Sequence, residues 1–314
     1  MTREATPPTV ELLEPREVPL GGQRAMLVRR TLPHKNIRTI GAWCFVDDYG
    51  PADIAGTDGM QVPPHPHTGL QTVSWLLEGD VLHRDSLGSQ QRIEPGQLNL
   101  MTAGSGIAHA EQSPETRASD ALRGVQLWVA LPDDQRHAAP AFDHHADLPV
   151  VEDDSWRATV LLGSFDGVES PARAFTPIVG AEVRVDAGEH RLPLDRAFEH
   201  GLLALDEGLA FDGLQAQPGS MVYLDEERPD VAVSAASAGR LLLLGGIPLD
   251  EELLMWWNFV ARDHDEIVEM RTAWMQAVEG ADTRFGQVTA YEGPSLPAPA
   301  MPMTRLRARP GRRT

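Results

Sequence analysis

Short apolar segments separated by tight-turn signals run through most of this 314-residue chain, and this rhythm limits the folds open to it. Leu70–Glu78 is rich in β-branched and apolar residues and stops at Gly79-Asp80. Glu94-Pro95-Gly96-Gln97 places Pro and Gly where a tight turn needs them, just before Leu98–Thr102. The other strands expected in this half are Val81–Asp85, Gln91–Ile93, Ile107–Glu111 and Val125–Leu131. Strands at this spacing predict an all-β sandwich or barrel.

The same layout returns in the second half of the chain. Gly201–Leu205, Leu209–Leu214 and Met221–Leu224 are separated by an acidic-Gly turn and by a Pro-Gly turn. A chain of this length also exceeds the size at which a single hydrophobic core stops growing. We therefore expect two β-barrels of related architecture, at residues 1–147 and 148–292, followed by an extended or disordered tail at 293–314.

One helix is expected near the C-terminus, at residues 263–278, within the second domain. Asp263 can cap its N-terminus and Glu266 completes a capping box. The apolar residues that fall on one face at helical spacing are Ile267, Met270, Trp274 and Ala277. This face is expected to pack against a barrel.

Charge and composition exclude several classes of function. The net charge of −19 makes direct binding to nucleic acid or to an anionic membrane unfavourable. No apolar run approaches the ~20 residues of a membrane span, and the first residues lack the apolar stretch of a signal peptide. We therefore expect a cytoplasmic protein. Cys44 is the single cysteine and is expected to be a small buried residue between Trp43 and Phe45.

Two histidines two residues apart stand in Pro63-Pro64-His65-Pro66-His67. On a strand, residues i and i+2 point to the same face. Pro66 excludes a helix interior and suits an edge strand or the start of a strand. Both imidazoles are therefore expected to face one way.

A second pair with the same spacing occurs in Ile107-Ala108-His109-Ala110-Glu111. If the two strands lie side by side in a barrel, three imidazoles and one carboxylate converge on one interior point. That donor set suits a first-row divalent metal such as Fe(II), Mn, Ni, Cu or Zn and leaves open positions on an octahedral ion. The expected ligands are His65, His67, His109 and Glu111.

Several of the remaining histidines are not expected to bind a metal. His144 and His145 are adjacent, so on a strand they face opposite ways, and His190 and His200 are isolated. These four are expected to be surface or hydrogen-bonded residues. His83 is expected to line the barrel or to form a hydrogen bond near the site, where it could orient a ligand, and not to be a fifth ligand.

Several segments together closely resemble the pirin family. In the first half these are Pro64-His65-Pro66-His67-Thr68-Gly69-Leu70-Gln71-Thr72, His83-Arg84-Asp85-Ser86-Leu87-Gly88 and Met101-Thr102-Ala103-Gly104-Ser105-Gly106-Ile107-Ala108-His109-Ala110-Glu111. Shorter similar segments are Val28–Pro33, Asp47–Pro51, Leu77–Gly79 and, in the second half, Leu241–Leu249. The resemblance covers most of the chain, from about Arg29 to Gly286.

The resemblance implies a bicupin, in which two cupin-type β-barrels follow one another and iron, Fe(2+), is bound in the first barrel by the residues that match His65, His67, His109 and Glu111. Some members of the family are quercetin 2,3-dioxygenases. Thr68 stands where the family often has Arg, and Gln71 where it often has Glu. Neither position matches a ligand, so the change bears on the charge of the pocket and on the choice of substrate.

Two functional hypotheses follow. The first is a metal-dependent dioxygenase that opens a flavonol such as quercetin, with Glu111 as proton acceptor and an apolar pocket near Leu70, Leu98, Met101 or Trp75. The second is an iron-dependent, redox-sensing regulatory protein that binds a protein partner without turnover. A zinc- or nickel-dependent hydrolase or isomerase is a third, less favoured class. The residues favour the dioxygenase.

Overall fold

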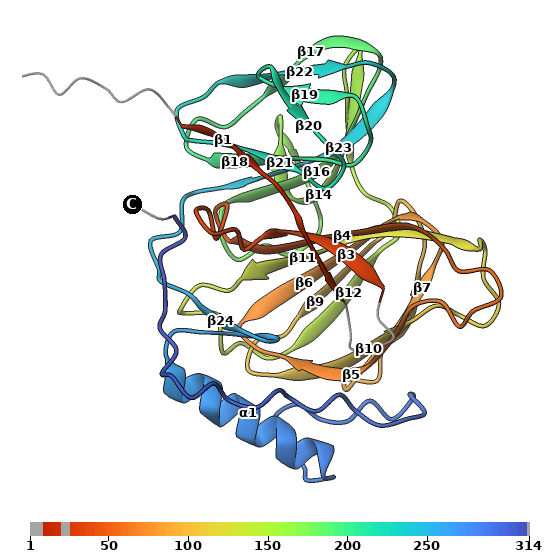
Figure 1. The fold of residues 1–314 in the computed structure, drawn as a ribbon, viewed down its shortest axis with the longest axis vertical. Coiled ribbons are helices and arrows are strands. Elements are labelled where there is room, and N and C mark those ends of the chain that lie inside the picture. The colour runs from red at the N-terminus through yellow and green to blue at the C-terminus, as the bar shows by residue number, and fades with distance from the viewer. Residues whose placement is uncertain (1–8, 20–25, 313–314) are drawn as a thin grey trace, which may run out of the picture. The chain divides into compact units, whose positions relative to one another are not determined.

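The computed structural model describes residues 9–19 and 26–312, which form two compact units of β-strands with one helix (Figure 1). Of these residues, 9–15, 39–43 and 148–248 form unit 1, and 16–19, 26–38, 44–147 and 249–312 form unit 2. The all-β architecture expected from the strand–turn rhythm is confirmed. The units are discontinuous in sequence, however, and therefore differ from the expected domains 1–147 and 148–292.

Unit 2 contains two main sheets. The larger has, in spatial order, β12 (Ala141–His145), β9 (Leu98–Thr102), β6 (Leu70–Glu78), β11 (Ala121–Ala130), β4 (Trp43–Asp53), β3 (Leu27–Leu32) and β2 (Arg16–Pro19). The smaller has β5 (Gln61–His67), β10 (Ile107–Gln112), β7 (Val81–Asp85) and β8 (Gln90–Ile93). Buried apolar side chains from both sheets, such as Val28, Leu76, Val62 and Ile93, pack together between them. A short hairpin, β24 (Leu254–Trp256) and β25 (Phe259–Ala261), completes the unit.

Unit 1 repeats this arrangement. Its larger sheet has β1 (Val10–Leu13), β21 (Met221–Leu224), β18 (Glu199–Ala204), β23 (Gly239–Gly246), β16 (Ile178–Val185), β14 (Trp156–Phe165) and β13 (Val150–Glu152), with β15 (Val168–Glu169) paired to β14. Its smaller sheet has β17 (Gly188–Pro193), β22 (Asp230–Ala235), β19 (Leu209–Phe211) and β20 (Leu214–Ala216). Val160, Leu202 and Leu243 from one sheet and Leu192 and Val231 from the other fill the space between them.

The single strand expected at Leu209–Leu214 is wrong. The chain turns at Asp212 and Gly213, which both adopt positive φ angles, of 46° and 81°. Two successive residues with positive φ form the tight turn that suits a two-residue hairpin. The segment is therefore the hairpin β19–β20 and not one continuous strand.

Helix α1 (His264–Val278) begins after Asp263, whose carboxylate accepts hydrogen bonds from the backbone N–H groups of Asp265 and Glu266. The Glu266 carboxylate accepts from the backbone N–H of Arg262, one residue before the cap, so the expected capping box is shifted. No helix among residues 9–19 and 26–312 combines the length and the hydropathy that a membrane span requires.

The helix packs in unit 2, although the sequence suggested the second domain. Its buried residues Ile267, Met270 and Trp274 lie in one cluster with Ala108 and Phe285. Ala108 belongs to β10 and Phe259 to β25, so the apolar face of the helix shares one hydrophobic cluster with both strands. Periodicity identifies an apolar face, but it does not say which barrel covers it.

The segment after the helix contacts the rest of unit 2 through a few backbone hydrogen bonds and bridges. The backbone N–H of Leu296 donates to the carbonyl of Pro64, and Arg309 pairs with Leu253 as an isolated β-bridge. Arg312 forms a similar bridge with Ile37. The extended or disordered tail expected at 293–314 stays a prediction.

Candidate metal centre

Strands β5 and β10 lie side by side and antiparallel, as the two paired motifs require. His109 stands directly opposite His65, and Ile107 stands opposite His67. The register shifts between His109 and Glu111, where β5 carries an extra residue at Pro63-Pro64. Such a bulge bends a strand and re-aims its side chains. β5 is an edge strand of its sheet, where proline is tolerated because no ladder partner is lost on the outer side.

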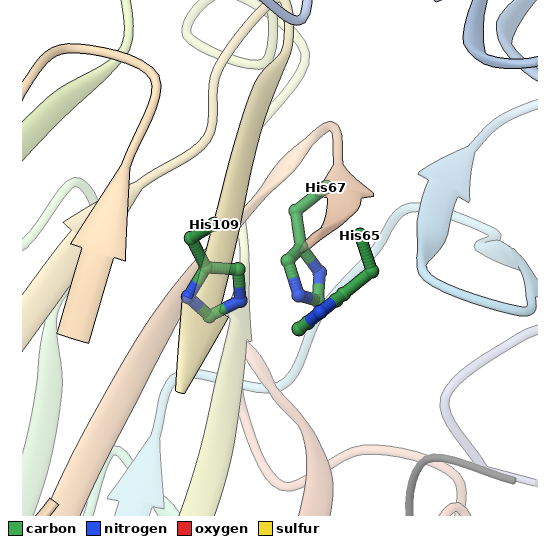
Figure 2. Close-up of side chains that lie close together, drawn as sticks. All are labelled: His65, His67 and His109. Carbon is green, nitrogen blue, oxygen red and sulfur yellow. The ribbon is translucent and has the colours of Figure 1, made fainter. Parts of the chain in front are cut away.

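The imidazoles of His65, His67 and His109 converge on one point inside unit 2 (Figure 2). One ring nitrogen from each lies within 4.8 Å of the others, and the ring centroids are 4.3–5.0 Å apart. All three side chains are buried. Three nitrogens this close together could hold one metal ion.

The three imidazoles are neutral, which is the form that binds metals. Burial lowers the pKa of His65 to about 4, and burial also lowers the pKa of His67 and of His109 well below the ordinary value. The backbone carbonyl of Pro63 lies 2.9 Å from His65 Nδ1 and can only accept a hydrogen bond. His65 Nδ1 therefore carries the hydrogen, and Nε2 keeps its lone pair.

A buried nitrogen without a partner tests whether a metal fits here. Among the residues that the structure describes, His109 Nε2 has no hydrogen-bond partner and no contact with solvent. A buried polar atom without a partner costs about 1–3 kcal/mol, and a bound metal ion would remove that cost. The donor set and this orphaned atom both fit a first-row divalent metal.

Glu111 belongs to a second, overlapping group. One of its carboxylate oxygens lies within 4.8 Å of ligand atoms of His109 and His83. The Ser74 hydroxyl lies 3.3 Å from Glu111 Oε1 and 2.9 Å from Gln126 Oε1. The surrounding protein removes water from the carboxylate and so raises the pKa of Glu111. The structure brings Glu111 to His109, but the four-ligand assignment stays a prediction.

His83 and Asp85 make more contacts close to the proposed ligands than the sequence indicated. Across the β7–β10 pairing, Asp85 lies opposite His109 and His83 lies opposite Glu111. His83 Nε2 is 3.1 Å from Asp85 Oδ2, and His83 Nδ1 is 3.4 Å from His109 Nδ1. The shared i, i+2 spacing of 83 and 85 was a signal for this proximity, since both side chains face the same side of the sheet as His109 and Glu111.

The site opens into a cavity of about 520 Å³. His65, His67, His109 and Glu111 form part of its wall. The rest of the wall is mixed: its apolar residues include Phe45, Tyr49, Met60, Val62, Trp128, Met255, Trp257 and Leu296, and its polar residues are Arg16, Arg30, Thr72, Gln126 and Asn258. This volume lies in the range of about 300–1,000 Å³ that is typical of small-molecule sites.

One wall of the cavity is a stack of flat groups. Phe45 and Trp128 are parallel, with their ring centroids 3.9 Å apart, and Trp128 meets His67 edge-on. The Arg30 guanidinium lies 4.3 Å above the Phe45 ring and makes two hydrogen bonds of 2.7 Å to the buried carboxylate of Asp47. Contacts of this kind hold the wall in one conformation.

The residues expected to line the pocket do not line it. Leu70, Leu98, Met101 and Trp75 are buried in the core and absent from the cavity wall. The same holds for the two positions that depart from the family pattern: the Thr68 hydroxyl contacts Met270 Sδ at 3.0 Å, and the Gln71 amide donates to the Thr102 hydroxyl. The expected effect of Thr68 and Gln71 on pocket charge therefore has no direct route to this cavity.

Comparison with known proteins gives matches over both halves of the chain. Residues 25–129 match the family model described as Pirin, and residues 180–279 match the one described as Pirin C-terminal cupin domain. A Pseudomonas aeruginosa protein named "Putative quercetin 2,3-dioxygenase" is 45% identical over 91% of this chain and 89% of that protein. A pirin-like protein of Caulobacter vibrioides is 33% identical, covering 79% of this chain and 87% of that protein.

Solved structures agree with this. The crystal structure titled quercetin 2,3-dioxygenase from Acinetobacter baumannii has a TM-score of 0.89 and 41% identity, over 95% of this chain and 97% of that one. A bacterial pirin from Escherichia coli, solved in complex with nickel(II), has a TM-score of 0.60 over 77% of this chain and 100% of that one. Its identity of 17% shows likeness of fold alone.

Proposed function

Because this chain belongs to the pirin family, with its two cupin domains, we propose that it is a metal-dependent dioxygenase which opens the heterocyclic ring of a flavonol such as quercetin. Its proposed ligands are His65, His67, His109 and Glu111, and its proposed metal is Fe(2+). When bound, the metal supplies positive charge and open coordination positions for substrate oxygen atoms. Support for a metal of this class comes from the donor set and from the orphaned His109 nitrogen.

The observation that carries the proposal is the cavity itself. Neutral imidazoles and one carboxylate stand at one wall of a space that can take a small aromatic molecule, and Phe45, Tyr49, Trp128 and Trp257 are among the side chains that form the rest. A flat substrate is held in one orientation by flat walls, and Phe45 and Trp128 supply such a wall. Orienting a substrate beside a reactive centre is itself a large part of catalysis.

Glu111 is the proposed proton acceptor. The carboxylate would take the proton of the flavonol 3-hydroxyl on one of its oxygens, which leaves an electron-rich flavonolate that reacts with dioxygen. Its raised pKa favours this role, because a carboxylate of higher pKa is a stronger base. The hydroxyl of Ser74 is placed to hydrogen-bond Glu111 Oε1 and so to hold the carboxylate in position.

The wall also controls water at the site. His65, His67 and His109 are at most 7% exposed, and Trp128 beside them is 6% exposed. The imidazoles beside Glu111 are therefore shielded from bulk solvent. The reaction adds dioxygen and releases carbon monoxide, so uptake of one gas and release of another are both measurable.

The test is anaerobic loading of the metal-free protein with Fe(II), followed by quercetin and oxygen. We expect loss of flavonol absorbance, with equal amounts of oxygen consumed and carbon monoxide released. His109→Ala should abolish turnover. Glu78→Gln, which removes an exposed carboxylate at the end of β6, serves as the control and should leave turnover unchanged. No flavonol loss with Fe(II), Mn(II), Ni(II) or Cu(II) would overturn the proposal.

The same metal-loaded protein can distinguish the dioxygenase from the second hypothesis, an iron-dependent regulatory protein. It requires a protein partner whose binding depends on the metal, in a protein that turns over no flavonol. If His65→Ala changed partner binding while the wild type consumed no oxygen, the second hypothesis would replace the first. The cytoplasmic location expected from the sequence stays a prediction.

A further inference from the structure

We propose that Asp85 and His83 are positioning residues that fix the tautomer of His109, so that its Nε2 presents a lone pair to the metal. This inference rests on the proposed metal centre but not on the proposed reaction. It assigns a role to two side chains of β7 that are not among the four proposed ligands.

The three side chains form a chain of contacts on one face of the sheet. Asp85 Oδ2 lies 3.1 Å from His83 Nε2, and His83 Nδ1 lies 3.4 Å from His109 Nδ1. Asp85, His83 and His109 are 2–3% exposed, so water does not compete for these contacts. The pairing of β7 with β10 places them together, because Asp85 is opposite His109 and His83 is one pair further along the same face.

The order of donors and acceptors follows from the carboxylate. An ionised carboxylate only accepts hydrogen bonds, so His83 Nε2 must carry its hydrogen. In the arrangement that we propose, His83 Nδ1 accepts and His109 Nδ1 donates across the 3.4 Å contact between them. His109 Nε2 is left without a hydrogen, and this is the nitrogen that is buried without a partner among the described residues.

Further contacts hold Asp85 and His83 in place, and we call the chain of contacts from Asp85 through His83 to His109 the relay. Asp85 Oδ1 accepts from the backbone N–H groups of Leu87 at 2.9 Å and Ser89 at 3.0 Å, which anchors the carboxylate. The His83 ring lies parallel to Phe142, with a centroid separation of 4.3 Å and an angle of 12°. Neither Asp85 nor His83 can therefore rotate away without losing packing or hydrogen bonds.

Metal-ligating histidines generally donate their second ring N–H to a carboxylate, a carbonyl or water, and loss of that partner typically weakens metal binding about 10–100-fold. Here the partner would be a second imidazole, itself fixed by a carboxylate. The competing possibility is that His83 binds the ion directly, since its ring nitrogen also lies within 4.8 Å of His109 and Glu111 ligand atoms.

Asp85→Asn separates these possibilities. The asparagine Oδ1 keeps the contacts with Leu87 and Ser89, while its amide group donates to His83 Nε2. His83 then carries its hydrogen on Nδ1, and His109 Nδ1 must accept instead of donate. His109 is driven to the tautomer with hydrogen on Nε2, which cannot bind a metal through that atom. Reversal of a histidine tautomer by this same change has a precedent in serine-protease triads.

The first measurement uses metal-free protein labelled with ¹⁵N-histidine. Long-range ¹H–¹⁵N correlation spectra distinguish the two tautomers of each ring. We expect His109 to have hydrogen on Nδ1 in the wild type and on Nε2 in Asp85→Asn, with Asp143→Asn, an exposed change on β12, as the unchanged control. An identical His109 tautomer in the wild type and in Asp85→Asn would overturn the proposal.

The second measurement is Co(II) affinity in competition with a chelator, arranged as a double-mutant cycle. Asp85→Asn should weaken Co(II) binding about 10–100-fold in the wild type and have no effect in a His83→Phe background, where the relay is already broken. Equal losses in both backgrounds would contradict the relay. If His83→Phe removes Co(II) altogether while Asp85→Asn leaves the His109 tautomer unchanged, His83 is a ligand. Neither readout requires turnover, so failure of the dioxygenase proposal would leave this test intact.

Discussion

Trp274 on helix α1 offers a direct test of how packing of the helix stabilises the part of unit 2 that includes β10, the strand with His109 and Glu111. Its side chain is 2% exposed, meets Phe285 edge-on at 5.6 Å, and donates from Nε1 to the carbonyl of Leu296 at 2.8 Å. The same cluster includes Ala108 and Ala110, which alternate with His109 and Glu111 along β10. Removing the indole would therefore leave a cavity behind the strand that carries two proposed ligands.

We expect Trp274→Ala to lower the free energy of unfolding of unit 2 by about 3–5 kcal/mol, the usual loss for a buried tryptophan. About 1 kcal/mol of this belongs to the hydrogen bond with Leu296. Trp274→Phe keeps a ring against Phe285 and loses the hydrogen bond, so its loss should be clearly smaller.

The assay is urea unfolding of the metal-free protein followed by far-ultraviolet circular dichroism, because removal of a tryptophan disturbs fluorescence. Val268→Ala, at a 37% exposed position of the same helix, is the matched control and should change stability by no more than about 0.5 kcal/mol. Co(II) affinity should fall in Trp274→Ala and stay unchanged in Val268→Ala. A loss below about 1 kcal/mol in Trp274→Ala would refute the claim that the apolar face of the helix is packed in this cluster.

Three further predictions concern single side chains. His109→Ala should lose its bound metal, which elemental analysis of the purified protein measures; full occupancy would remove His109 from the ligand set. Glu111→Gln should lower quercetin turnover by about 10²–10⁴-fold with little change in the unfolding midpoint, and near-normal turnover would exclude it as the proton acceptor. Burial lowers the pKa of His200 to about 4, so the unfolded chain takes up a proton between pH 6.5 and 4 that the folded chain does not. Wild-type stability should therefore fall by about 3 kcal/mol more than that of His200→Leu as pH drops through this window, and equal pH profiles in urea unfolding would contradict it.

The local geometry of the site follows from its spacing. Pro66 between two histidines excludes a helix, and alternation then places both rings on one side of a strand. The same reasoning applies to His109 and Glu111, and β5 and β10 are neighbours in the structure. The bulge at Pro63-Pro64 did not follow from the sequence, because it depends on how β5 registers against a partner strand far along the chain.

The cavity wall could not be read from periodicity. β6 is buried at seven successive positions, from Leu70 to Leu76, so its pattern does not say which side faces the site. Thr72 lines the cavity from this strand, whereas Trp75 points into the core. Phe45, Trp128 and Met255 come from three other strands, and their convergence depends on long-range packing.

Placement of the helix needed the same long-range information. The apolar face with Ile267 and Trp274 was evident from spacing, but Ala108, its partner on β10, lies far earlier in the chain. Ala108 and Ala110, the small residues on either side of His109, leave room for a covering layer. The small size of these two residues can be interpreted only when it is known that the side of β10 opposite His109 and Glu111 is covered by other residues.

The contact between Leu296 and Pro64 also sets an order of events during synthesis. At about 5–20 residues per second, Leu296 and Pro297 leave the ribosome roughly ten to fifty seconds after His65 and His67. Until then the nascent chain has its histidines but not the last part of the cavity wall. The wall of this cavity is thus completed only when the last part of the polypeptide has been synthesised.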